Sequence, residues 1–320
     1  MRYRAVGDSG LMVSVVGVGC NAFGARIDFD QTKAVVDTAL DAGISFFDTA
    51  DSYADGVSEE FLGRALGARR EDVIVATKFG MGDHDAEHFG AHAGRRYVRR
   101  AVEASLRRLG TDYIDLYQLH RPDSITPIDE TLDAMSELVT EGKVRYIGSS
   151  NLTAWQVVDA DWTARTAGTR RFISAQNEYS LYNRVAEDEL VPACERFGIG
   201  LLPYFPLAYG LLTGKYRRDT DAPAGSRLAN ANQAGRLTGA DWDRIEALQA
   251  FADARGLPLL TVAIGGLAAQ PAVASVISGA TRPEQITSNV AAGDWEPSAA
   301  DLAELDELRH SEAFSYTTFA

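Results

Sequence analysis

Short apolar segments alternate with longer amphipathic segments along most of the chain. The apolar segments are rich in Val, Ile and Tyr, and eight of them occur, at residues 15–19, 45–50, 73–78, 113–120, 144–150, 172–179, 200–207 and 275–280. Helical patterns lie between them, for example at 31–43, 95–110, 129–142 and 187–198, and these end at or beside Gly43, Gly110, Gly142 and Gly198. A glycine in that place is typical of a helix C-terminus. The alternation predicts parallel strands joined by right-handed helical crossovers.

Eight such units favour a closed barrel over an open sheet. An open dinucleotide-binding sheet usually has a glycine-rich phosphate turn after its first strand. Here Gly17 and Gly19 are followed by CNAFG, which lacks the third glycine in its proper place. We therefore predict an α/β protein with a (β/α)8 barrel, a TIM barrel, forming one domain over residues 1–320.

Four further segments fall outside the repeat. RYRAV, the turn GDSG and LMVSVVGVG predict a β-hairpin ahead of the barrel. A polar loop at 80–94, a long Gly/Ala-rich loop at 208–240 and a tail at 309–320 follow the third strand, the seventh strand and the last helix. Because βα loops crown the C-terminal face of a barrel, we expect these long connections to border the functional site.

Composition restricts the partners and the compartment. The chain has 31 basic and 45 acidic side chains and a net charge of −14. This balance argues against nucleic acid, because a phosphate backbone requires a basic face. Cys20 and Cys194 make no disulfide framework. No signal-peptide pattern and no run of about 18–20 apolar residues is present, so we expect a cytoplasmic protein without a membrane partner.

Four polar residues stand at the ends of three consecutive predicted strands. Asp48 and Tyr53 lie in FFDTADSY, Lys78 ends VIVATK, and His120 ends YIDLYQLH. Such groups are costly beside an apolar core unless they pair with one another, so we expect them to meet on one rim of the barrel. Taken singly, a lone histidine is more often a satisfied core residue, and a lone tyrosine a half-buried aromatic.

Together these four residues suggest protonation of a carbonyl oxygen. An ammonium beside a phenol is expected to lower the phenol pKa from its usual value of about 10, and a carboxylate keeps the ammonium charged. A neutral histidine can donate a hydrogen bond to the carbonyl oxygen. The set supplies no hydride, so a nicotinamide cofactor is expected to supply it.

A histidine series in the 80–94 loop suggests a different chemistry. His84, His88 and His92 recur every four residues beside acidic side chains, a spacing that could hold a metal on a helix. The segment is rich in glycine and reads as a loop, so we predict no metal site and interpret it as a rim of the substrate site.

The motifs together identify a family. FFDTADSY, VATKFG and LYQLHRPD resemble the signature segments of the aldo-keto reductases, as do IGSSN, SAQNEYS and PLAYGLLTGKY. The resemblance covers nearly the whole chain and implies a barrel that reduces small aldehydes or ketones with a nicotinamide cofactor. It implies Asp48, Tyr53, Lys78 and His120 as the catalytic tetrad.

The resemblance also implies where the cofactor binds. Ser150, Asn151 and Gln176 would hold the nicotinamide carboxamide, and Tyr204 would stack on its ring. The remaining cofactor residues implied lie in two segments: Phe205, Pro206, Leu207, Gly210, Leu211, Lys215 and Arg227 in the first, and Gly279, Ala280, Thr281, Arg282, Gln285 and Asn289 in the second. The second segment opens a helix, whose free N–H groups favour a phosphate.

This chain departs from the family pattern in two places. Phe205 stands where many members have Ser before the Pro-Leu pair, which puts a ring in the cofactor channel. Gly279, Ala280 and Gln285 stand where some members grip a 2′-phosphate with Lys, Ser and Arg. Arg282 is the one strong cation left there, and it leads us to expect NADPH, with NADH as the alternative.

Two other functions stay open. Potassium channel beta subunits resemble this family, so a cofactor-binding regulatory module with little turnover is one alternative. A lyase with a Schiff base at Lys78 is the other. Asn21 and Phe23 are the first candidates for substrate contacts. The tail aromatics Phe314 and Tyr316 are further candidates. The sequence indicates neither the physiological substrate nor the oligomeric state.

Overall fold

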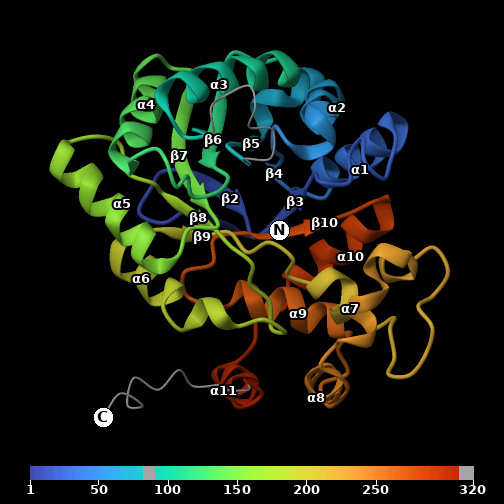
Figure 1. Ribbon diagram of the computed structural model, residues 1–320. Coiled ribbons are helices and arrows are strands. Elements are labelled where there is room, and N and C mark those ends of the chain that lie inside the picture. Colours follow the sequence, from blue (N-terminus) through green and yellow to red (C-terminus); the bar gives the residue numbers. More distant parts are fainter. Residues whose placement is uncertain (82–90, 310–320) are drawn as a thin grey trace, which may run out of the picture.

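The computed structural model describes residues 1–81 and 91–309. Within them, eight parallel strands form one sheet in the order β10-β3-β4-β5-β6-β7-β8-β9. The strands lie at the centre and the helices surround them (Figure 1). This arrangement confirms the predicted (β/α)8 barrel.

The element bounds follow the predicted segments closely. The strands are β1 (Tyr3–Ala5), β2 (Met12–Ser14), β3 (Val16–Gly19), β4 (Phe46–Asp48), β5 (Ile74–Phe79), β6 (Ile114–Leu119), β7 (Val144–Ser150), β8 (Ser174–Gln176), β9 (Gly200–Leu201) and β10 (Val276–Gly279). The α-helices are α1 (Phe29–Asp41), α2 (Val57–Leu66), α3 (Arg95–Leu109), α4 (Ile128–Thr140), α5 (Ala154–Ala167), α6 (Leu190–Phe197), α7 (Ala234–Thr238), α8 (Trp242–Asp253), α9 (Leu259–Ala268), α10 (Pro283–Gly293) and α11 (Ala299–Glu307).

The barrel closes between β9 and β10. Leu201 N–H donates to the Ala272 carbonyl at 2.7 Å and its carbonyl accepts from Ala274 at 2.9 Å, while Ile277 N–H donates to Pro203 at 3.1 Å. These bonds satisfy the edges that an open sheet would leave exposed. The closure sets the C-terminal ends of all eight strands on one rim.

The predicted N-terminal hairpin is confirmed and covers one end of the barrel. β1 and β2 pair antiparallel, with Tyr3 opposite Ser14. Val6, Leu11 and Val13 of this hairpin are buried in a cluster with inward-facing strand residues such as Phe46 and Leu116. The hairpin therefore seals the interior opposite the βα loops. A larger buried cluster fills the layer between strands and helices.

Two predicted segments differ from the structure. The seventh strand, expected over 200–207, keeps only Gly200–Leu201, because Pro203 and Pro206 have no N–H to donate to a ladder. The loop expected over 208–240 contains short helical turns, including η5 (Ala208–Thr213), η6 (Arg227–Ala229), η7 (Ala231–Gln233) and α7. In the described part of the chain, no helix is long and apolar enough to cross a membrane.

Candidate active site

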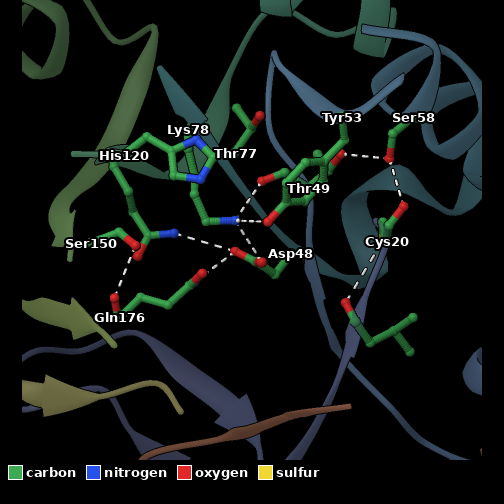
Figure 2. A network of polar contacts seen from close by, with 12 residues as sticks. Cys20, Asp48, Thr49, Tyr53, Ser58, Thr77, Lys78, His120, Ser150 and Gln176 are labelled. Atoms are coloured by element: carbon green, nitrogen blue, oxygen red, sulfur yellow. Dashed lines mark hydrogen bonds and ion pairs between the residues drawn. The ribbon is translucent and has the colours of Figure 1, made fainter. Parts of the chain in front are cut away.

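Lys78 is the centre of a buried polar network on the rim (Figure 2). It comes from β5 and its side chain has no exposed surface. Its ammonium donates to Asp48 Oδ2 at 2.7 Å, to the Thr49 carbonyl at 2.9 Å and to the Tyr53 hydroxyl at 3.2 Å. Burial lowers the pKa of Lys78, but the Asp48 carboxylate and the Tyr53 hydroxyl outweigh it and raise that pKa above its ordinary value. Lys78 is therefore a charged donor here.

Asp48, at the end of β4, is held by two amides as well as by Lys78. Its Oδ1 accepts from Gln176 Nε2 at 2.8 Å and from Gln118 Nε2 at 3.3 Å. Strand register explains why Gln118 reaches this carboxylate together with Lys78, because Lys78 pairs directly with Gln118 across β5 and β6. Ser174 Oγ donates to Gln118 Oε1 at 3.4 Å and orients that amide. The buried carboxylate thus has a donor on each oxygen, as a buried charge requires.

Tyr53 is the first residue of η1 (Tyr53–Gly56), and its phenol faces Lys78 and His120. Its ring lies 5.9 Å from the His120 ring, edge to face. Burial raises the pKa of Tyr53 above its ordinary value, and the Lys78 ammonium opposes this shift without outweighing it. Our expectation of a lowered phenol pKa is therefore wrong, because burial penalises the phenolate more than the ammonium stabilises it. The phenol keeps its proton at neutral pH.

His120, after β6, is neutral in this site. Burial and the positive charges of Lys78 and Arg121 lower its pKa from 6.5 to about 3. Its Nδ1 is buried without a hydrogen-bond partner among the described residues. A neutral imidazole beside a phenol is suited to orient a carbonyl oxygen by hydrogen bonding.

The residues expected at the nicotinamide carboxamide form one linked chain beside the tetrad. Asn151 Nδ2 donates to the His120 carbonyl at 2.9 Å and to Ser150 Oγ at 3.0 Å, and its Oδ1 accepts from Tyr204 OH at 2.7 Å. Ser150 Oγ donates to the Gln176 carbonyl at 2.9 Å. The side-chain amide of Gln176 instead donates to Asp48. Asn151 has φ 60, a left-handed conformation that asparagine tolerates well.

The first expected cofactor segment forms a strained loop after β9. Phe205 has φ 52, and its ring lies 5.0 Å from the Tyr204 ring and 4.2 Å from the Tyr209 ring. Arg227 lies over Phe205, with its guanidinium carbon 5.4 Å from the ring centre. The other expected members line the same turn: Pro206 and Leu211 are buried, Leu207 and Gly210 are partly exposed, and Lys215 is exposed.

The second expected cofactor segment surrounds the start of α10. Gly279 ends β10, Arg282 is the N-cap residue of α10, and Pro283 opens the helix. Gln285 Oε1 accepts from Thr281 N–H at 2.7 Å. Ala280 and Asn289 are buried, whereas Arg282 is exposed. One exposed cation, Arg282, lies at this helix start, and the small residues Gly279 and Ala280 leave room beside it. These features suit the phosphates and adenosine of a nicotinamide dinucleotide.

The two expected substrate residues are separated by the fold. Asn21 is partly exposed at the rim, where its Oδ1 accepts from Arg26. Phe23 has no exposed surface and packs in the main core, so we correct its assignment: a fully buried ring cannot contact a substrate. His84, His88, Phe314 and Tyr316 lie outside the described residues.

Several residues near the site were missed from the sequence. Gln118 lies two residues before His120 on the same strand face, and that spacing could have found it. Asp51, Tyr209, Arg26 and Arg236 had no such signal, because they lie in loops and short helical turns and not at strand ends.

Comparison with known proteins finds a family match and several similar proteins. The Aldo/keto reductase family matches residues 15–310. A probable voltage-gated potassium channel subunit beta of Oryza sativa subsp. japonica is 37% identical over 306 residues, covering 93% of this chain and 92% of that protein. Versiconal hemiacetal acetate reductase of Aspergillus parasiticus is 33% identical, with 96% of each chain covered. The uncharacterized oxidoreductase YqkF of Bacillus subtilis (strain 168) is 36% identical, with 92% of each covered.

Asp51 lies in the turn between β4 and η1, two residues before Tyr53. Its Oδ1 is buried without a hydrogen-bond partner among the described residues, while its N–H donates to the Lys78 carbonyl at 3.1 Å. Burial and the neighbouring Glu59 carboxylate raise the pKa of Asp51 from 3.8 to about 7, against the opposing charge of Arg108.

Asp51→Asn is therefore expected to stabilise the protein at alkaline pH. Between about pH 4 and 7 the folded Asp51 keeps its proton while the unfolded one loses it, so its contribution to stability is lost as pH rises. Thermal melting should show the variant about 2 °C or more above wild type at pH 8, with a smaller difference at pH 5. The exposed Asp112→Asn is the control. A difference that does not grow with pH would contradict the shifted pKa.

Proposed function

Since the chain belongs to the aldo/keto reductase family of NAD(P)H-dependent oxidoreductases, we propose that it reduces aldehydes or ketones to alcohols with NADPH, and that Tyr53 donates the proton. The observation that carries this proposal is the meeting of a protonated phenol, a charged lysine and a neutral histidine on one rim. The bound nicotinamide would supply the hydride to the carbonyl carbon.

The proton comes from the Tyr53 hydroxyl in this mechanism. As negative charge develops on the carbonyl oxygen, the phenol transfers its proton to that oxygen. The Lys78 ammonium, 3.2 Å from the phenol oxygen, stabilises the phenolate that results. Asp48 keeps Lys78 oriented and charged. Solvent then returns a proton to Tyr53 before the next turnover.

His120 orients the same carbonyl oxygen without exchanging a proton. Its pKa of about 3 leaves the imidazole neutral over the whole physiological range. A neutral ring offers one N–H to the carbonyl oxygen, whereas a cation beside Lys78 would be repelled. The cofactor residues proposed from the family pattern stay as assigned, and Arg282 is the proposed 2′-phosphate ligand that favours NADPH.

A regulatory module is the second candidate, and the similarity to the potassium channel beta subunit favours it. Those relatives show that family membership covers proteins named for a channel role as well as proteins named as reductases. The intact tetrad supports turnover in this chain. The Schiff-base lyase is disfavoured, because a fully buried, charged Lys78 with three hydrogen-bond acceptors is a poor amine nucleophile.

Tyr53→Phe should abolish carbonyl reduction while NADPH still binds. Removing the proton donor is expected to lower kcat by about 100-fold or more, because general acid catalysis typically contributes that much. Steady-state kinetics with a panel of aldehydes and calorimetric titration of NADPH measure the two effects separately. Near-normal turnover in the variant would refute the role of Tyr53, and tight NADPH binding by wild type without turnover on any aldehyde would favour the regulatory module.

Arg282→Ala should weaken NADPH binding about tenfold and leave NADH binding nearly unchanged. The guanidinium at the N-cap of α10 is exposed and suited to a 2′-phosphate, which NADH lacks. Titration of both cofactors against wild type, Arg282→Ala and the charge-preserving Arg282→Lys gives the comparison. An equal loss for both cofactors would remove Arg282 from the 2′-phosphate.

A further inference from the structure

The first turn of α2 is hydrogen-bonded to residues that adjoin Lys78. Ser58 is buried there, and its Oγ lies 2.9 Å from Thr49 Oγ1 and donates to the Cys20 carbonyl at 2.8 Å (Figure 2). The Thr49 carbonyl is one of the three groups that accept from the Lys78 ammonium. Thr49 is therefore bonded to α2 through its side chain and to Lys78 through its backbone.

Glu59, the next residue of α2, makes a second link to the same lysine. Its side chain has no exposed surface, and its Oε1 accepts from Thr77 Oγ1 at 2.5 Å. Thr77 directly precedes Lys78 on β5, so the two side chains leave opposite faces of that strand. Glu59 therefore fixes β5 on one face, while Asp48 accepts from the ammonium on the other.

Arg108 connects Glu59 with the turn that carries Tyr53. Its Nε donates to Glu59 Oε2 at 2.6 Å. Its side chain packs against Gly56, where an added Cβ would lie 2.6 Å from Arg108 Cδ. Gly56 has φ 90 and joins η1, which begins at Tyr53, to α2. A side chain at Gly56 would displace the guanidinium, in a backbone conformation that already favours glycine.

The outer face of this turn borders a cavity instead of close-packed core. Asp51, Ser52 and Asp55 line the cavity, which has a volume of about 610 Å³ and is also lined by α3 residues that include Arg107 and Arg108. Close packing, which fixes most buried side chains, is therefore weak on this side of the turn. Directional polar contacts then carry more of the work of fixing its position.

We propose that Glu59 is a positioning residue, which acts through Thr77 and Arg108 to keep the Tyr53 hydroxyl aligned with the Lys78 ammonium. The inference rests on the proposed function and deepens it. A displacement of about 1 Å between reacting groups can lower a rate by about 100-fold, so a small loss of alignment is measurable. An acidic side chain in the first turn also stabilises the helix start, but Glu60 in the same turn shares that role.

Glu59→Gln tests this role, because the amide keeps the shape of the side chain and removes its charge. For the aldehyde that wild type reduces fastest, kcat should fall about tenfold while KM stays within about twofold. In oxidation of the corresponding alcohol, the midpoint of kcat/KM against pH should rise by about half a unit, because a misaligned ammonium stabilises the Tyr53 phenolate less. Loss of a negative charge acting only through space would lower that midpoint.

The substitution leaves the surroundings of the phenol chemically unchanged. The titratable groups that face Tyr53 come from β3, β4, β5, β6 and the segment after β9, and they are those of Cys20, Asp48, Lys78, His120 and Tyr204. A rise of the midpoint therefore reports on the alignment of these groups and not on the removal of one of them.

Glu60→Gln is the matched control, since Glu60 is exposed in the same helical turn. Thr77→Val, which removes only the hydroxyl that donates to Glu59, should give part of both effects and carries the test if thermal melting shows that Glu59→Gln does not fold. Thr77→Ser should restore wild-type values.

An unchanged kcat and midpoint in the folded variant, a lowered midpoint, or the same changes in Glu60→Gln would overturn the proposal. Failure of the proposed function would show differently, as absence of turnover by wild type on any aldehyde, and the positioning role would then be refuted with it.

Discussion

The site depends on the ion pair between Lys78 and Asp48, which is buried beneath the rim of the barrel. A lysine without any exposed surface is tolerated only because a carboxylate, a backbone carbonyl and a phenol accept its three donors. The carboxylate in turn depends on the amides of Gln118 and Gln176. Loss of one member would leave a buried charge uncompensated, so the network holds the geometry of Tyr53 and the ends of β4, β5 and β6 at once.

The parallel register of the barrel brings these groups together. Lys78 pairs with Gln118, and Ser150 pairs with Gln176, so side chains from four strands stand at nearly one level. The closing bonds between β9 and β10 then place the Tyr204 and Gly279 segments on the same rim. The proposed catalytic group and the expected cofactor segments therefore share one rim because the sheet is closed.

Much of this could be predicted from the sequence, because strand alternation and glycine helix ends are local signals. The barrel and the hairpin are confirmed. The four polar side chains expected to converge do lie together on the rim, because position at a strand end determines position there, and their catalytic roles stay a prediction. The pKa shift of Tyr53 was predicted in the wrong direction. The cost of burying a phenolate depends on the packing of the whole site, which the residues adjacent in sequence do not reveal. Phe23 was misplaced for a similar reason: a loop residue after β3 turns into the core.

The loops were least predictable. The seventh strand is shortened by two prolines, and the following segment holds Phe205 and Tyr209 in left-handed conformations that a propensity argument does not anticipate. Arg227 and Arg236, from the short helical turns that follow, place their guanidinium carbons 5.0 Å and 3.6 Å from the centre of the Tyr209 ring. Such contacts depend on the closed barrel and become visible only in three dimensions.

The most direct test of the central claim is the pH dependence of alcohol oxidation, the reverse reaction, in which Tyr53 must act as a phenolate base. Wild type should be compared with the double variant Asp48→Asn/Lys78→Met, which removes both buried charges together. Our account predicts that kcat/KM rises with pH in wild type and that its midpoint moves to higher pH in the double variant, because the ammonium no longer stabilises the phenolate. An identical midpoint in both proteins would show that Lys78 does not control Tyr53 and would contradict the account.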